Sequence, residues 1–100
     1  MAIDMLTKKE ILDFLKKNKA FFKKEFGVEN IMLFGSYARG EETSSSDIDI
    51  LIDVKKKSFD NRSKLKEFLE KHFQKKVDIL YHDSVRRFIM RSIKDELIYA

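Results

Sequence analysis

A seven-residue segment, Asp47 to Asp53, constrains the fold more than any other part of the chain, because acidic and aliphatic residues alternate along it. A period of two predicts a β-strand, in which alternate side chains point to the same face. Asp47 and Asp49 therefore share one face, with backbones about 6.5–7 Å apart. Acidic residues inside a strand oppose both strand propensity and burial, which indicates a functional site. Asp53 has the same parity, but we interpret it as the end of the strand.

The residues around this strand predict an α/β fold with a small mixed sheet of three main strands. Thr7 and Glu10 have capping-box spacing and open a helix that we expect to continue to Gly27. The order of elements is α-β-α-β-α-β-α, with strands Val28–Phe34 and Lys76–Tyr81, a helical turn Tyr37–Arg39 and a helix Asp60–Phe73. A last helix is predicted after Asp83 or Ser84, with Val85, Phe88, Ile89, Ile93 and Leu97 buried.

The connections between strands predict how they pair. A helix separates the second strand from the third, as a parallel crossover requires. The first and second strands are joined by a short turn and loop, so we expect them to be antiparallel. The end of the first strand would then lie beside the starts of the other two.

Length and composition exclude several classes of protein. We expect 100 residues to form one domain, residues 1–100, with no room for a second domain that holds an acceptor. The absence of cysteine excludes disulfides and a thiolate nucleophile. With no apolar run of bilayer length and no secretory signal, we expect a cytoplasmic protein without membrane contact. The net charge of +4 comes from scattered lysines, which fit a solvated surface better than a nucleic-acid site.

The predicted topology brings chemically useful residues to one edge of the sheet. Asp78, flanked by apolar residues, joins Asp47 and Asp49 there, and three crowded carboxylates need a compensating cation. Hard oxygen ligands suit Mg²⁺, of which we expect two ions. Gly35 lets backbone amides approach a phosphate, and Ser36 opens a helical turn. Together these residues predict a site for a nucleoside triphosphate and metal.

The segments Gly35-Ser36-Tyr37-Ala38-Arg39-Gly40-Glu41 and Ser46-Asp47-Ile48-Asp49-Ile50-Leu51 resemble the signature of the minimal nucleotidyltransferases of the DNA polymerase β-like superfamily. The resemblance extends to Val77-Asp78-Ile79-Leu80 and, in the order of elements, to nearly the whole chain. It implies a palm-like mixed sheet, Mg²⁺ dependence and transfer of AMP from ATP to a hydroxyl. It also implies a partner, a HEPN-domain ribonuclease toxin that the family neutralises by adding AMP to a tyrosine, in a hetero-oligomer.

The resemblance assigns roles to individual residues. Asp47 and Asp49 would bind both metals, and Asp78 would bind the catalytic metal and help deprotonate the acceptor. Gly35 and Ser36 would hold the β- and γ-phosphates. Arg39 has three open interpretations: contact with the triphosphate, contact with the partner, or completion of a helix end.

The sequence also leaves alternative functions open. The chain could neutralise its toxin by binding alone, while a small-molecule acceptor or direct nucleic-acid binding is less consistent with the sequence.

His72 and His82 are interpreted as surface or boundary residues away from the acidic edge. Core positions are expected for most of the group Phe14, Phe21, Phe22 and Phe26, with one ring exposed. Arg86, Arg87 and Arg91 fit a solvated helix face better than a surface for an acidic partner. Tyr99 has three open interpretations: packing, contact with a partner, or acceptance of AMP.

Overall fold

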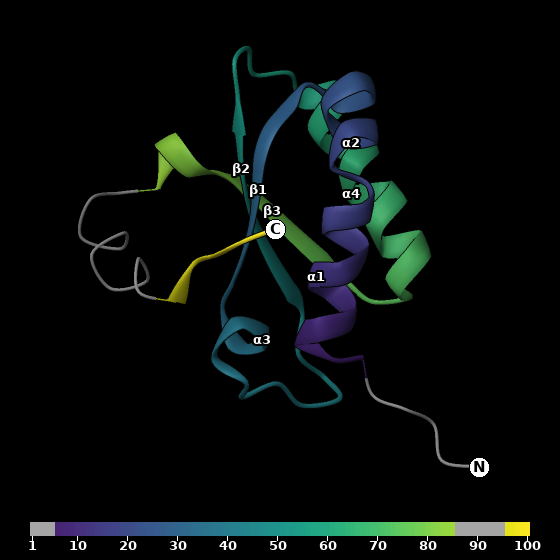
Figure 1. The fold of residues 1–100 in the computed structure, drawn as a ribbon, viewed down its shortest axis with the longest axis vertical. Helices are drawn as coiled ribbons and strands as arrows, with labels where there is room; N and C mark the ends of the chain where they lie inside the picture. The colour runs from purple at the N-terminus through teal and green to yellow at the C-terminus, as the bar shows by residue number, and fades with distance from the viewer. Residues whose placement is uncertain (1–5, 86–95) are drawn as a thin grey trace.

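The computed structural model describes residues 6–85 and 96–100, in which helices cover one face of a four-stranded mixed sheet. Figure 1 shows α1, α2 and α4 together on one side of the sheet, while α3 lies at one end. The helices are α1 (Lys8–Lys17), α2 (Lys19–Phe26), α3 (Ser36–Arg39) and α4 (Phe59–Phe73), followed by a 3₁₀ turn, η1 (His82–Ser84). The strands are β1 (Val28–Phe34), β2 (Ile48–Val54), β3 (Val77–Tyr81) and β4 (Ile98–Tyr99).

The first helix begins as predicted but does not continue to Gly27. Thr7 and Glu10 form a complete capping box, in which each side chain accepts from the other residue's backbone N–H. The helix then breaks at Asn18 into α1 and α2, because the Asn18 side-chain amide donates to the Phe14 carbonyl at 2.8 Å and competes with the helical backbone pattern. The prediction of one uninterrupted helix is therefore wrong at this position.

The sheet has the predicted pairing and one additional strand. β1 is antiparallel to β2, and β2 is parallel to β3, as expected. β4 pairs antiparallel with β1 and extends the sheet to the order β3-β2-β1-β4. The predicted last helix falls mainly on residues outside the described part, and so do Arg86, Arg87 and Arg91. Leu97, predicted to be inside it, lies in neither a helix nor a strand.

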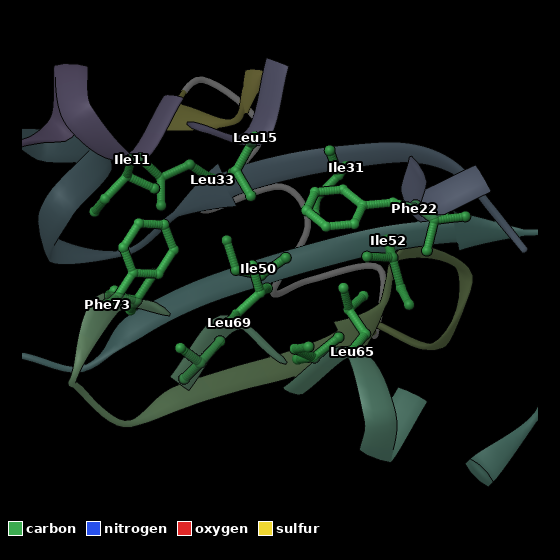
Figure 2. Close-up of a cluster of buried hydrophobic side chains, with 14 of the residues drawn as sticks. Ile11, Leu15, Phe22, Ile31, Leu33, Ile50, Ile52, Leu65, Leu69 and Phe73 are labelled. Carbon is green, nitrogen blue, oxygen red and sulfur yellow. The ribbon is translucent and has the colours of Figure 1, made fainter. Parts of the chain in front are cut away.

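The hydrophobic core lies between the helices and the sheet. Every second residue of β2 (Ile48, Ile50 and Ile52) points into it and is at most 2% exposed. Figure 2 shows Ile50 and Ile52 facing helical side chains, which include Ile11, Leu15, Phe22, Leu65, Leu69 and Phe73. An aromatic cluster around Phe14, which stacks on Phe68 and His72, links α1 to α4. As predicted, one ring of the N-terminal group, Phe21, is exposed.

The intervening residues of the strands form the opposite face of the sheet. Met32 and Leu51 are buried there, whereas Leu80 and Tyr99 are about half exposed. The two faces of β2 therefore differ: one is packed with aliphatic side chains, and the other carries Asp49.

None of the helices in the described residues is both long and apolar enough to cross a bilayer.

Candidate active site

Two of the three predicted carboxylates lie next to each other on adjacent strands. Asp49 of β2 is the register partner of Asp78 of β3. Both residues alternate with core-facing neighbours, so both carboxylates project from the face opposite the helices. Asp47 directly precedes β2, where the Ile48 amide donates to the Lys76 carbonyl at 3.0 Å and fixes the strand start beside β3. The parallel crossover thus brings Asp49 and Asp78 together, as the sequence predicts.

Asp49 is the electrostatically strained member of this group. Partial burial raises its pKa to about 6, and the neighbouring carboxylates of Asp78 and Asp47 contribute to the increase. Arg39 opposes the shift, and Glu96 adds to it. A carboxylate held in this way has unsatisfied negative charge, and a cation at the site would relieve it.

Gly35 brings the backbone against Asp49. Phe34, the last residue of β1, pairs with Asp49, and the chain turns at Gly35 with φ +79°. A Cβ at this position would overlap the Oδ2 atom of Asp49 and lie 3.0 Å from its Cγ. Only glycine satisfies both the positive φ and this close approach. The turn therefore exposes backbone without a side chain directly beside the acidic pair.

Ser36 and Arg39 are presented by the short helix α3. Tyr37 anchors this helix, because its ring is fully buried in the core. The Arg39 amide donates to the Gly35 carbonyl at 3.1 Å, and the Glu41 amide donates to the Ser36 carbonyl at 2.9 Å. The following loop is closed by the Thr43 amide, which donates to Ser46 Oγ at 2.8 Å. The predicted helical turn is confirmed, starting one residue earlier, at Ser36.

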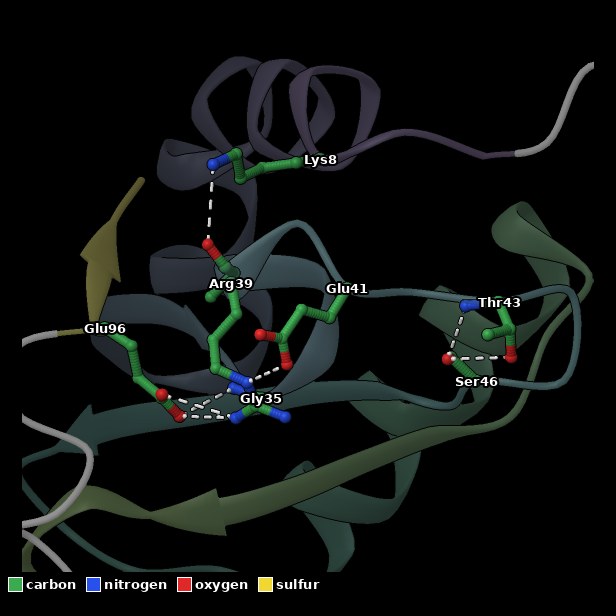
Figure 3. A network of polar contacts seen from close by, with 8 residues as sticks. Lys8, Gly35, Arg39, Glu41, Thr43, Ser46 and Glu96 are labelled. Carbon is green, nitrogen blue, oxygen red and sulfur yellow. Dashed lines mark hydrogen bonds and ion pairs between the residues drawn. The ribbon is translucent and has the colours of Figure 1, made fainter.

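Arg39 reaches the site through two ion pairs, shown in Figure 3. Its Nε donates to Glu41 at 2.9 Å, and its Nη1 donates to both carboxylate oxygens of Glu96 at 3.2 and 3.3 Å. Glu96 also accepts from the backbone N–H of Gly35 at 3.3 Å. Of the three interpretations of Arg39, contact with the triphosphate is consistent with this position. The Arg39 guanidinium and the Gly35 amide both donate to the Glu96 carboxylate, and a phosphate is an anionic acceptor of the same kind.

Sequence reasoning missed Glu96. Its position follows from the pairing of β4 with β1, in which Leu33 is opposite Ile98 and Met32 is opposite Tyr99. Continuing that register by two residues places Glu96 opposite Gly35. A two-residue strand has no periodic signal, so local sequence patterns could not have identified this neighbour.

The described side chains do not form a complete set of metal ligands by themselves. Within residues 6–85 and 96–100, no three Asp, Glu or His side chains are gathered closely enough to hold an ion. Asp49 and Asp78 nevertheless offer hard oxygen ligands of the type that Mg²⁺ prefers, with Asp47 nearby. These residues fit a cation whose remaining ligands come from elsewhere, for example from phosphate oxygens.

Other candidate residues lie away from this site. Asp53, one residue before the end of β2, accepts from His82 Nδ1 at 3.0 Å and from the Asn30 side-chain amide at 3.3 Å. His72 stacks on Phe14, with ring centroids 3.6 Å apart. Tyr99 is 55% exposed on β4. Both histidines are thus away from the acidic edge, as expected.

The four-stranded mixed sheet with helices on one face is the fold of minimal nucleotidyltransferases. The chain belongs to the nucleotidyltransferase domain family, whose model matches residues 9–100. A Methanocaldococcus jannaschii protein named as a protein adenylyltransferase, MJ1379, is 41% identical over 100 residues, which cover 96% of this chain and 100% of the relative. The protein adenylyltransferase MntA of Thermococcus cleftensis is 36% identical, with 96% of this chain and 98% of the relative covered.

Solved structures have the same fold. A minimal nucleotidyltransferase superposes with a TM-score of 0.78 at 22% identity, covering 96% of this chain and 98% of that one. A toxin–antitoxin structure with AMP-PNP gives 0.60 at 26% identity, covering 84% and 64%. An MNT antitoxin bound to a tri-AMPylated HEPN toxin of Shewanella oneidensis gives 0.58 at 20% identity, covering 92% and 66%. The predicted fold and family are confirmed.

Proposed function

We propose that this nucleotidyltransferase transfers AMP from ATP to a hydroxyl, with tyrosine as the expected acceptor, on a partner HEPN toxin, and thereby acts as an antitoxin in a hetero-oligomer. Residues 1–100 would act as a single catalytic domain, and the partner would supply the acceptor surface. The observation that carries the proposal is the pairing of Asp49 with Asp78 beside the side-chain-free backbone of Gly35.

Relatives and structural neighbours support the choice of substrate and partner. Relatives that match across nearly their full length are named protein adenylyltransferases. One neighbour was solved with the ATP analogue AMP-PNP, and another with an AMPylated HEPN toxin. The charge of the site favours the same substrate, because crowded carboxylates accept a triphosphate only together with a cation.

Each residue of the site has a proposed role. Asp47, Asp49 and Asp78 would hold two Mg²⁺ ions, and Gly35, Ser36 and Arg39 would bind the β- and γ-phosphates. Bound Mg²⁺ would neutralise charge on the triphosphate and lower the pKa of the acceptor hydroxyl. The acceptor oxygen forms a bond to the α-phosphorus, the bond to the β-phosphate oxygen breaks, and pyrophosphate leaves in line. Asp78 takes the proton of the acceptor hydroxyl.

The direct test is transfer of label from α-³²P-ATP to the cognate HEPN protein in the presence of Mg²⁺. The wild-type chain should label the partner, and addition of EDTA should abolish labelling. The double variant Asp47→Asn, Asp49→Asn removes two ligand charges with little change of shape. If this variant labels the partner as well as the wild type does, the proposed catalytic site is wrong.

A second candidate function is neutralisation by binding alone, which the structures of related antitoxins in complex with their toxins favour. The same double variant separates the two functions. If it still protects cells from the toxin while transferring no label, complex formation is sufficient. If protection is lost while the complex still forms, as judged by co-purification, transfer of AMP is required.

A further inference from the structure

The Glu96 carboxylate binds two of the groups that the proposed function assigns to the triphosphate. It accepts from the Gly35 backbone N–H at 3.3 Å and from Arg39 Nη1 at 3.2 and 3.3 Å. In Figure 3, dashed lines join this carboxylate to both donors. A carboxylate and a phosphate present the same chemistry to an N–H and a guanidinium, since both are anionic oxygen acceptors.

Glu96 is held at this position by the sheet. The pairing of β4 with β1 begins at Ile98, two residues after Glu96, and extending the same register to Glu96 places it opposite Gly35. Its side chain is only 17% exposed. Because β4 begins only two residues after Glu96, its pairing with β1 keeps the Glu96 carboxylate beside Gly35 and Arg39.

We propose that Glu96 competes with the triphosphate for Gly35 and Arg39, and so sets the affinity of the site for nucleotide. This inference rests on the proposed function. The two anions cannot use the same donors at once, so the Glu96 carboxylate has to withdraw when phosphates bind. If the donors are released in only about one molecule in ten, the apparent Kd is about tenfold weaker than the intrinsic value.

Glu41 provides a matched comparison, because it also pairs with Arg39 but does not contact Gly35. Its carboxylate accepts from Arg39 Nε at 2.9 Å and is 66% exposed. An exposed pair of this kind is screened by solvent and contributes little. Glu41 can therefore stay on Nε while a phosphate uses Nη1 and the Gly35 amide. Only Glu96 stands where the phosphate has to bind.

The experiment measures binding of Mg²⁺·AMP-PNP by isothermal titration calorimetry, so that no turnover or partner is needed. Glu96→Gln removes the charge and should tighten binding by about fivefold or more. Glu96→Asp keeps the charge but is one methylene shorter, and it should also tighten binding because it cannot reach both donors. Glu41→Gln should change the Kd by less than twofold. Adenosine, which lacks phosphates, should bind all four proteins equally.

Each alternative has its own result. If Glu96→Gln tightens binding but Glu96→Asp does not, the effect is general electrostatics and the competition is wrong. If either Glu96 variant binds more weakly, Glu96 positions Arg39 for the nucleotide and the proposal is overturned. If the wild type and every variant fail to bind Mg²⁺·AMP-PNP, the proposed function itself fails. If the wild type binds and the Glu96 variants bind equally, only this inference fails.

A measurement on the wild-type protein tests the same displacement even if a variant does not fold. In protein labelled with ¹³C in glutamate side chains, the Glu96 carboxyl resonance should shift when Mg²⁺·AMP-PNP is added, and it should not shift with adenosine. An unmoved Glu96 resonance at saturating AMP-PNP would contradict displacement, whatever the variants do.

Discussion

The two faces of the sheet carry different kinds of side chains. On the helix-covered face, aliphatic and aromatic side chains pack with almost no exposure and without charge. On the other face, at the end of β1, Gly35 lies against the carboxylates of Asp49 and Glu96, and the Arg39 guanidinium pairs with Glu96. β2 contributes to both faces, since Ile48 and Ile50 flank Asp49. Around Asp49, stability and chemistry thus alternate from one residue of the strand to the next, and single substitutions there should separate them.

The largest effect is expected on the acidic side, from Gly35→Ala. The added Cβ would overlap Asp49 Oδ2, and alanine disfavours φ +79°. We expect AMP transfer to fall by about a hundredfold or more, because displacing reacting groups by about 1 Å has costs of this size. Labelling of the partner under single-turnover conditions measures the loss.

Gly27→Ala is the matched control. Gly27 has φ +70°, but a Cβ there meets no atom within 4 Å. Gly27→Ala incurs about 1 kcal/mol in stability for its left-handed backbone. Gly35→Ala, at φ +79° and ψ −157°, incurs about 1–3 kcal/mol, and only this variant also disturbs the site. Equal loss of transfer in the two variants would refute the proposed role of the close approach to Asp49.

The next effect is expected on the helix-covered side. Leu69 is fully buried, so Leu69→Ala should lower the free energy of unfolding by about 2–5 kcal/mol through lost contacts and a cavity. Urea unfolding monitored by circular dichroism measures the loss. Nucleotide affinity at temperatures where the variant is folded should change by less than twofold.

Leu80→Ala is the corresponding control on the opposite face. Leu80 is 49% exposed on β3, next to Asp78. Its loss should cost less than about 1 kcal/mol, since exposed positions contribute little. If Leu80→Ala destabilises the protein as much as Leu69→Ala, the division between the two faces is wrong.

How much of the structure the sequence could predict depends on whether a feature follows from a local pattern or from a contact between distant residues. The alternation around Asp49 and the apolar flanks of Asp78 are local patterns, so the strands, their pairing and the acidic edge followed from them. The break at Asn18 arises because one side-chain hydrogen bond competes with a helix that periodicity favours. Glu96 depends on a two-residue strand that pairs across more than 60 residues of chain. Its proximity to Gly35 is therefore a property of the tertiary fold alone.

A smaller effect is expected from Asp49→Asn, which removes the strained charge. The folded-state pKa of Asp49 is about 6, above the ordinary value of 3.8, so the folded protein binds more protons than the unfolded chain between these pH values. Stability contributed by Asp49 is therefore present at low pH and is lost as the pH rises through 4 to 6. Two pKa units correspond to about 3 kcal/mol, which solvent screening of this part-buried group reduces to about 1.5 kcal/mol.

Asp49→Asn should accordingly be more stable than the wild type at pH 7.5 and lose that advantage near pH 4. Urea unfolding at both pH values, without added metal, measures the difference. Asp60→Asn on the surface of α4 serves as the control, because its carboxylate is exposed and its ion pair with Lys64 is screened by solvent. A wild-type advantage at pH 7.5 over Asp49→Asn would contradict the raised pKa.

The smallest effect is expected where the two regions meet, at the start of α1. Thr7 caps this helix, and the next residue, Lys8, donates from Nζ to the Ala38 carbonyl of α3 at 3.4 Å. Thr7→Ala should cost about 0.5–1 kcal/mol in unfolding free energy, while Thr7→Ser keeps the hydroxyl and should cost less. Binding of Mg²⁺·AMP-PNP should change by less than twofold, since the buried Tyr37 ring holds α3 without the help of Lys8. A larger change in affinity than in stability would mean that α1 positions the phosphate-binding turn, and that the two regions are coupled through this contact.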